Sequence, residues 1–385
     1  MTINTVPATP DIIKDCILEL AKDKDLRKIA PYIWGPPGIG KSDIVRQIAA
    51  ELNWGLIDLR LTRMDSVDLT GLPYLSEDTK QTIYYLPEFL PTKEMIEEWG
   101  RQGCIIFLDE LSAAEPRLQA SAYELILDRR IGKYSLPDNV MVVAAGNRIE
   151  DGAIAYDLTS ALSDRFVHFN AMTSLDSWLK WEANRAKQGR PIAKEIKSFL
   201  QAQPQFLDEG FKVTGSTTDD KINPSPRTWE KVSNVMQTVT DDKKLKILIP
   251  GLLGDSTAQE FFFVIEEIAS LAPMSEYVRL GNMQDDEAIK AILPQKTSGL
   301  FGLGYSLPAY CTKEEDFLGA CYVFNVMANI NDSKPRKEIL VTSVISLMTK
   351  AQKVDNKTLP RKIGKSAAYK AMRKEHISAF AEIDV

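Results

Sequence analysis

Residues 35–42 limit the fold of this chain more than any other segment. They read Gly35-Pro36-Pro37-Gly38-Ile39-Gly40-Lys41-Ser42. An apolar run, residues 29–34, precedes them and predicts a buried strand, and residues 41–52 carry apolar side chains at helical spacing. Strand, glycine-rich loop and helix in this order are the setting in which G-x-x-x-x-G-K-[ST] forms a phosphate-binding loop. The segment therefore predicts an α/β fold with an anion site.

The chemistry of this loop suits a nucleoside triphosphate. Glycines let successive backbone N–H groups converge on an anion, and the helix N-terminus adds partial positive charge. The Lys41 ammonium can reach the β- and γ-phosphates, and the Ser42 hydroxyl can bind Mg²⁺. The alternative, a glycine-rich turn that binds nothing, is disfavoured because both flanking elements are present.

A second informative stretch is the apolar run that begins at Cys104 and ends in Asp109 and Glu110. Such a run predicts a buried parallel strand with its acids at the carboxyl end, the edge where open α/β sheets bind ligands. There Asp109 can orient Mg²⁺, and Glu110 can polarise an attacking water. The alternative is a solvated strand end, which the upstream phosphate loop makes less plausible.

Asn147 follows another expected strand, residues 140–145. Its side-chain amide could reach the attacking water or the γ-phosphate. The alternative interpretation of Asn147 is a simple turn residue.

Alternation of strands and helices continues to about residue 170, after which helical patterns dominate. We therefore predict a parallel five-stranded sheet covered on both faces over residues 1–170. A helical lid is expected over residues 171–275, and a mostly helical C-terminal extension over residues 276–385. The long connection 62–103 is expected to be functional or an insertion. A short hairpin is expected at residues 129–136.

Charge and composition limit the kinds of partner and site that are expected for this chain. The balance is 47 basic against 53 acidic residues, a net charge of −6, which makes no general case for nucleic acid. Residues 357–374 are locally basic, which indicates either a solvated helical face or a contact with a partner or a nucleic acid. Four scattered cysteines and two histidines disfavour zinc or disulfide frameworks. With no signal peptide or membrane-length apolar run, a soluble cytoplasmic protein is the expectation.

Taken together, these motifs occur in the order and approximate spacing of an AAA+ ATPase. Residues 65–73, 144–148 and 160–166 narrow the resemblance to the MoxR-like, dynein-related branch, and the likeness covers roughly residues 9–275. It implies ATP and Mg²⁺ as cofactors. Lys41 would bind phosphate, Ser42 and Asp109 would serve the metal, Glu110 would be the catalytic base, and Asn147 would be sensor one.

The resemblance also assigns two arginines. Arg165 would be the arginine finger, which in this family acts on a neighbouring subunit and requires an oligomer, usually a hexameric ring. Arg227 would be sensor two, acting either within its own chain or across an interface. An ion pair with a purely structural role is the alternative for Arg165.

The resemblance further implies that two insertions, near residues 66–92 and at the hairpin 129–136, face the pore of the ring. Tyr84, Tyr85 and Phe89 would then be candidate substrate contacts, and packing in the core is the alternative for these side chains.

The predicted function is therefore Mg²⁺-dependent ATP hydrolysis that drives remodelling of a protein client. A von Willebrand factor A domain protein is a partner suggested by the resemblance. Three alternatives remain: a nucleic-acid motor or loader, a nucleotide-gated scaffold with little hydrolysis, and the use of GTP in place of ATP.

Overall fold

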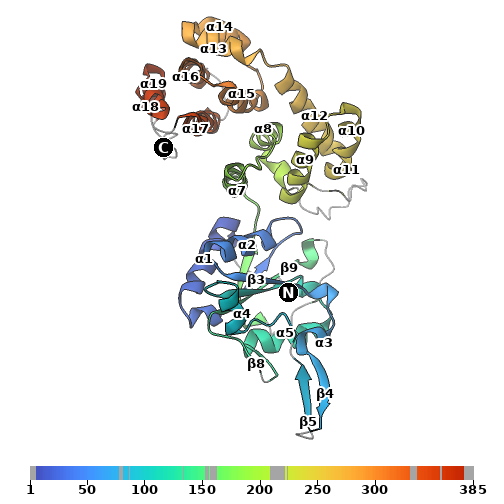
Figure 1. Ribbon diagram of the computed structural model, residues 1–385. Helices are drawn as coiled ribbons and strands as arrows, with labels where there is room; N and C mark the ends of the chain where they lie inside the picture. The colour runs from blue at the N-terminus through green and yellow to red at the C-terminus, as the bar shows by residue number, and fades with distance from the viewer. Residues whose placement is uncertain are drawn as a thin grey trace. The chain divides into compact units, whose positions relative to one another are not determined.

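The computed structural model describes residues 6–77, 81–85, 87–132, 134–151, 156, 163–208, 222, 224–329, 336–355 and 358–376. The chain divides into two compact units, residues 1–184 with 207–228 and residues 185–206 with 229–385 (Figure 1). The domain boundaries expected at residues 170 and 275 stay predictions. Residues 160–162, part of one of the segments on which the expected MoxR-like resemblance rests, lie outside the described residues.

The first unit contains a parallel sheet. Over the described residues it has six strands in the order β1-β10-β2-β9-β6-β3. They are β1 (Pro7–Ala8), β2 (Ala30–Trp34), β3 (Gly55–Arg60), β6 (Cys104–Asp109), β9 (Val140–Gly146) and β10 (Phe166–Ala171). Five correspond to predicted strands. The predicted number of five was wrong by the edge strand β1, because two residues are too short to show any periodicity.

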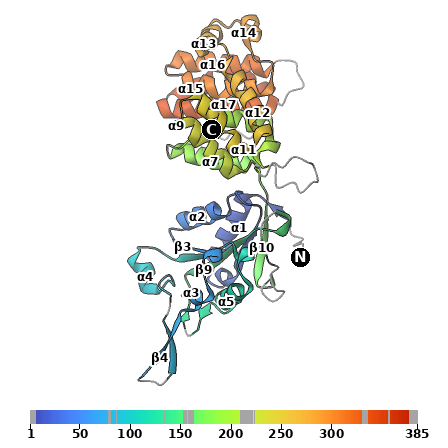
Figure 2. The same cartoon turned by 90° about the vertical axis from the view of Figure 1, so that its right-hand side faces the viewer.

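Helices cover both faces of this sheet (Figure 2). Helices α1 (Pro10–Lys22) and α2 (Lys41–Glu51) pack on one face, with Ile105 and Phe107 of β6 in their shared core. Helix α5 (Pro116–Leu127) packs on the other face, in a core that includes Ile106 and Leu108. Successive residues of a strand point to opposite faces, so a continuous apolar run is required wherever both faces are buried.

The long connection between β3 and β6 holds α3 (Ser66–Thr70), an antiparallel hairpin of β4 (Leu72–Ser76) and β5 (Gln81–Tyr85), and α4 (Lys93–Glu98). Figures 1 and 2 show this hairpin extending away from the sheet. The rings of Tyr74 and Tyr85 stack at 4.3 Å. The sequence predicted an insertion here but not its strands, because apolar residues fall on both hairpin faces and alternation is lost.

The short hairpin expected at residues 129–136 is present as β7 (Arg130–Ile131) and β8 (Tyr134–Ser135). Single 3₁₀ turns lie at Leu26–Lys28, Leu61–Arg63, Leu111–Ala113, Ile149–Asp151 and Pro204–Leu207.

The described part of the second unit is helical. Helix α7 (Leu175–Lys187) and α9 (Pro226–Thr238) run across the division between the units. The others are α8 (Lys194–Ala202), α10 (Asp242–Leu248), α11 (Pro250–Leu253), α12 (Asp255–Ala269), α13 (Met274–Met283), α14 (Asp286–Ile292), α15 (Thr297–Tyr310), α16 (Glu314–Ala328), α17 (Arg336–Val354), α18 (Leu359–Lys365) and α19 (Ala367–Glu375). Helices α8 and α12 pack against α15. None of the helices in the described ranges is both long enough and apolar enough to cross a bilayer.

Candidate active site

The glycine-rich loop connects β2 to α2, as its sequence predicts. Gly38 and Gly40 have φ of +86° and +104°, a left-handed region that side chains other than glycine rarely adopt. A Cβ on Gly38 would also lie only 2.7 Å from the Ser225 hydroxyl. Gly40 is the N-cap of α2, so the loop leads directly into a helix N-terminus. Backbone geometry and helix polarity here therefore suit an anion.

Lys41 is the centre of the site. Its side chain is buried, and its ammonium donates hydrogen bonds to Gly35 O at 2.6 Å, Pro36 O at 3.0 Å and Asn147 Oδ1 at 2.6 Å. Burial lowers the pKa of Lys41 to about 8, although the nearby Asp109 carboxylate opposes the shift. Three oxygen acceptors thus surround the ammonium, and phosphate oxygens could take their place.

The Ser42 hydroxyl donates to Asp109 Oδ2 at 3.0 Å. Burial raises the pKa of Asp109, the last residue of β6, while the hydrogen bond from Ser42 acts in the opposite direction. This hydroxyl and carboxylate fit Mg²⁺, which takes one or two carboxylates and completes its shell with water and substrate phosphates. A different kind of metal site, a cluster of three or more His, Cys, Asp or Glu side chains, is not found within the described ranges.

Glu110 leaves β6 in a left-handed conformation, with φ of +61°. Its backbone N–H donates to Asp109 Oδ1 at 3.0 Å, and its carboxylate accepts a hydrogen bond from the Thr62 hydroxyl. Thr62 lies just after β3. In the parallel pairing of β3 with β6, Arg60 is the residue opposite Asp109. Sequence reasoning missed Thr62, although its position after a predicted parallel strand could have indicated that it lies beside the acids.

Asn147 follows β9, and its side chain binds Lys41. Its backbone is held by the buried Ser112, whose hydroxyl donates to Asn147 O at 2.8 Å and accepts from Asn147 N–H at 3.0 Å. A Cβ at Gly146 would lie 2.2 Å from the Tyr32 hydroxyl oxygen and 2.6 Å from the Ser112 hydroxyl oxygen, so only glycine fits before Asn147. No local signal in the sequence marks Ser112, because it contacts a residue 35 positions away.

The two arginines differ in their surroundings. The backbone N–H of Arg227 donates to Gly38 O at 3.3 Å, so the start of α9 reaches the phosphate loop of the same chain. The Arg227 charge is among those that lower the pKa of Lys41, after burial. Arg165 is exposed in a turn before β10, and it forms no hydrogen bond or ion pair with another residue of the described ranges. The structure therefore gathers Lys41, Ser42, Asp109 and Asn147, places Arg227 at the loop, and leaves Arg165 facing solvent.

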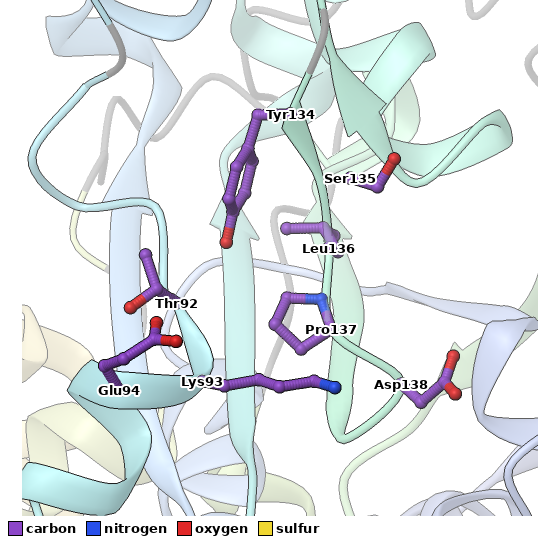
Figure 3. A pocket seen from close by; sticks show the side chains of 8 residues that line it. All are labelled: Thr92, Lys93, Glu94, Tyr134, Ser135, Leu136, Pro137 and Asp138. Carbon is purple, nitrogen blue, oxygen red and sulfur yellow. The ribbon is translucent and has the colours of Figure 1, made fainter.

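A separate depression of about 430 Å³ lies between the start of α4 and the segment around β8. Thr92 to Glu94 line one side and Tyr134 to Asp138 the other (Figure 3). The Tyr134 hydroxyl donates to Pro91 O at 2.6 Å. None of the residues predicted to bind nucleotide lines this depression, so it is not the candidate active site.

Comparison with known proteins agrees with this geometry. Residues 31–174 match the family described as "ATPase family associated with various cellular activities (AAA)". This range includes all the predicted site residues except Arg227. Residues 31–174 are therefore an AAA ATPase domain, and the chain is an ATPase with the AAA+ phosphate-loop fold.

Solved structures show a more distant likeness. A candidate ATPase from Cytophaga hutchinsonii is 13% identical, with 97% of this chain and 89% of that chain covered and a TM-score of 0.33. The RuvB Holliday junction branch migration motor of Thermotoga maritima is 16% identical over 59% of this chain and 61% of its own, with a TM-score of 0.36. A lysine-to-arginine mutant of the same RuvB is 14% identical over 77% of this chain and 88% of its own, with a TM-score of 0.39. At these values the likeness supports no conclusion about activity or assembly. No curated protein sequence matches the chain.

Proposed function

We propose that this ATPase is a MoxR-like motor that uses ATP and Mg²⁺ to remodel a protein client as a homo-oligomeric ring, with a hexamer as the expected size. The observation that carries the proposal is the set of contacts around Lys41. One buried ammonium bonds to the glycine loop and to Asn147, and Ser42 beside it bonds to Asp109. Phosphate binding, metal binding and γ-phosphate sensing would then occur at one edge of one sheet.

Each side chain has a defined task in this proposal. Lys41 exchanges its carbonyl acceptors for phosphate oxygens and neutralises their charge. Ser42 and Asp109 would hold Mg²⁺, which would supply charge stabilisation on the phosphates. Once its hydrogen bond with Thr62 is broken, the Glu110 carboxylate accepts the proton of the attacking water. Asn147 orients that water or the γ-phosphate. Arg227 contributes positive charge at the loop of its own chain.

Arg165 supports the ring in this proposal. It is exposed and lacks a partner within the described residues, so its guanidinium is available to a nucleotide held by an adjacent copy. A transition state with charge spread over equatorial phosphate oxygens is stabilised by such a donor. ATP turnover would then depend on the arrangement of the subunits.

Subunit mixing tests this assignment. Arg165→Ala subunits should be nearly inactive alone and should regain turnover when mixed with Glu110→Gln subunits. In the mixed ring, a Glu110→Gln subunit supplies its intact Arg165 to the neighbouring Arg165→Ala subunit, whose own site still contains Glu110. Arg117→Ala, at an exposed arginine of α5, is the matched control and should retain activity without mixing. Absence of rescue at every mixing ratio contradicts a finger that acts across an interface.

The β4–β5 hairpin supports a protein client. Tyr84 and Tyr85 are 54% and 63% exposed, and Leu75 is 80% exposed. Exposed apolar side chains clustered on one small element are typical of protein-contact surfaces. A von Willebrand factor A domain partner and a cytoplasmic setting stay predictions. Measuring turnover with ATP and with GTP, each in competition with the other, will decide the nucleotide.

A nucleic-acid motor is the second candidate, and the surface of α18 and α19 favours it. Six basic residues of these helices are exposed: Arg361, Lys362, Lys365, Lys370, Arg373 and Lys374. Of these, Lys362 pairs with Glu314 at 2.6 Å. Turnover stimulated by DNA or RNA, with binding that weakens steeply as salt rises, would support this candidate over the first.

A further inference from the structure

An aromatic cluster joins the strand that enters the phosphate loop to the strand that follows Arg165. Strands β2 and β10 are paired in parallel, with His168 opposite Tyr32. The Tyr32 and Trp34 rings stack at 4.1 Å, and the Trp34 and His168 rings lie 6.1 Å apart, nearly parallel. Trp34 is the last residue of β2 and directly precedes Gly35. His168 therefore lies on the strand after Arg165 and packs against the strand that enters the phosphate loop.

The hydrogen-bond partners of His168 indicate which nitrogen of the neutral ring carries the proton. The Trp34 indole N–H donates to His168 Nδ1 at 2.8 Å. An indole nitrogen can only donate, so Nδ1 must be an unprotonated acceptor. The proton of the neutral ring then lies on Nε2, which is 2.9 Å from the Ser163 carbonyl oxygen. His168 thus receives one hydrogen bond from β2 and donates another to the turn that carries Arg165.

This second bond holds the Arg165 turn from one side. Ser163 lies two residues before Arg165. On the other side, Phe166 is buried and packs edge-on against Tyr32, with ring centroids 5.0 Å apart. The backbone around Arg165 is therefore anchored before and after the residue, while its side chain stays exposed. Anchoring of this kind lowers the entropy lost when a guanidinium is placed against a transition state.

We propose that His168 is a positioning residue for ATP hydrolysis. Its Nε2–H bond to the Ser163 carbonyl fixes the turn so that Arg165 is presented to the nucleotide of the adjacent subunit. The inference rests on the proposed role of Arg165 as a finger acting between copies. Through Trp34, the same ring ties this turn to the strand that leads into the chain's own phosphate loop.

Two amide substitutions separate the two hydrogen bonds of His168. The amide nitrogen of His168→Gln falls near Nε2 and can donate to the Ser163 carbonyl. The amide oxygen of His168→Asn falls near Nδ1 and can only replace the acceptor for Trp34. We expect kcat to fall about ten- to a hundredfold in His168→Asn, with unchanged nucleotide affinity, and to be largely retained in His168→Gln. Equal loss in both variants, or no loss in either, overturns the proposal.

Subunit mixing distinguishes a positioning role from general damage. Because the defect lies in the finger, His168→Asn subunits should regain turnover when mixed with Glu110→Gln subunits, as Arg165→Ala subunits should. Rescue of Arg165→Ala without rescue of His168→Asn overturns the role of His168 and leaves the finger intact. Failure to rescue Arg165→Ala counts against the proposed function itself.

The tautomer can be measured in the unmodified protein, which covers the case in which a variant does not fold. The chain has only two histidines, so ring ¹⁵N signals can be assigned with a His376→Gln variant. We expect a protonated Nε2 and an unprotonated Nδ1 for His168, as its hydrogen-bond partners require. The opposite tautomer or a cationic ring would remove the donor–acceptor arrangement and overturn the proposal.

Discussion

The burial of Lys41 predicts that nucleotide affinity depends on pH near 8. Burial holds the pKa of this ammonium at about 8 in the nucleotide-free protein. Bound phosphates favour the charged form, so they raise this pKa and binding takes up a proton. The charge is present below pH 8 and is lost as pH rises through it. Affinity should therefore be highest below pH 8 and should decline above it.

The magnitude follows from the fraction of Lys41 that is charged. About 90% is protonated at pH 7 and about 10% at pH 9, so Kd should rise about tenfold between them. That factor corresponds to about 1.4 kcal/mol of binding free energy. At pH 8.5 about three-quarters of a proton should be taken up per nucleotide bound.

Calorimetric titration with a non-hydrolysable ATP analogue measures both quantities. Titrations at pH 7, 8 and 9 give the change in Kd, and buffers of different ionisation heat give the proton uptake. Lys41→Ala should bind weakly with little pH dependence in this range, and Lys41→Arg should stay charged throughout. If wild-type affinity is flat from pH 7 to 9, or if Lys41→Ala keeps the same slope, the buried ammonium is not the phosphate ligand.

Other predictions concern the residues around Lys41. Glu110→Gln should bind ATP normally but lose about 10²- to 10⁴-fold in turnover, and normal turnover in single-turnover assays would remove Glu110 as the base. In thermal melts, Gly38→Ala should lower stability by more than Gly40→Ala. Both positions have positive φ, and left-handed strain alone costs about 1–2 kcal/mol. Only at position 38 would the added Cβ also clash with Ser225. Ser112→Ala should cost about 1–3 kcal/mol in denaturant unfolding, since it leaves the backbone groups of Asn147 without their hydroxyl partner. An unfolding midpoint equal to that of the wild type would show that water or a rearranged backbone replaces the hydroxyl.

The nucleotide half of the site could be predicted from the sequence because its signals are local. The eight residues of the loop, the flanking apolar runs and the acids at the end of β6 are each contiguous in the chain. Parallel strands end at one edge of a sheet, so Lys41 and Asp109 could be expected near one another before their contacts were known. The structure shows these contacts, whereas the roles assigned to the site residues stay predictions until they are measured: Lys41, Ser42, Asp109, Glu110, Asn147, Arg165 and Arg227.

The supporting residues could not be predicted in the same way. Thr62 bonds to a residue 48 positions later, and Ser112 bonds to one 35 positions later. A hydroxyl has no sequence signature for such a role, because serine and threonine are ordinary in turns and strand ends. The left-handed backbone at Glu110, whose carboxylate accepts the hydrogen bond from Thr62, likewise has no pattern in the sequence.

The sequence alone determined that this chain has an α/β core with a phosphate loop, because periodicity and a short spaced motif depend only on neighbouring residues. The tertiary structure decided how the loop is supported. Pairing of β2 with β10 brings His168 beside Trp34, and the crossing from β6 to β9 brings Ser112 to Asn147. These contacts join residues far apart in the chain, and only the register of the folded sheet fixes which of them meet.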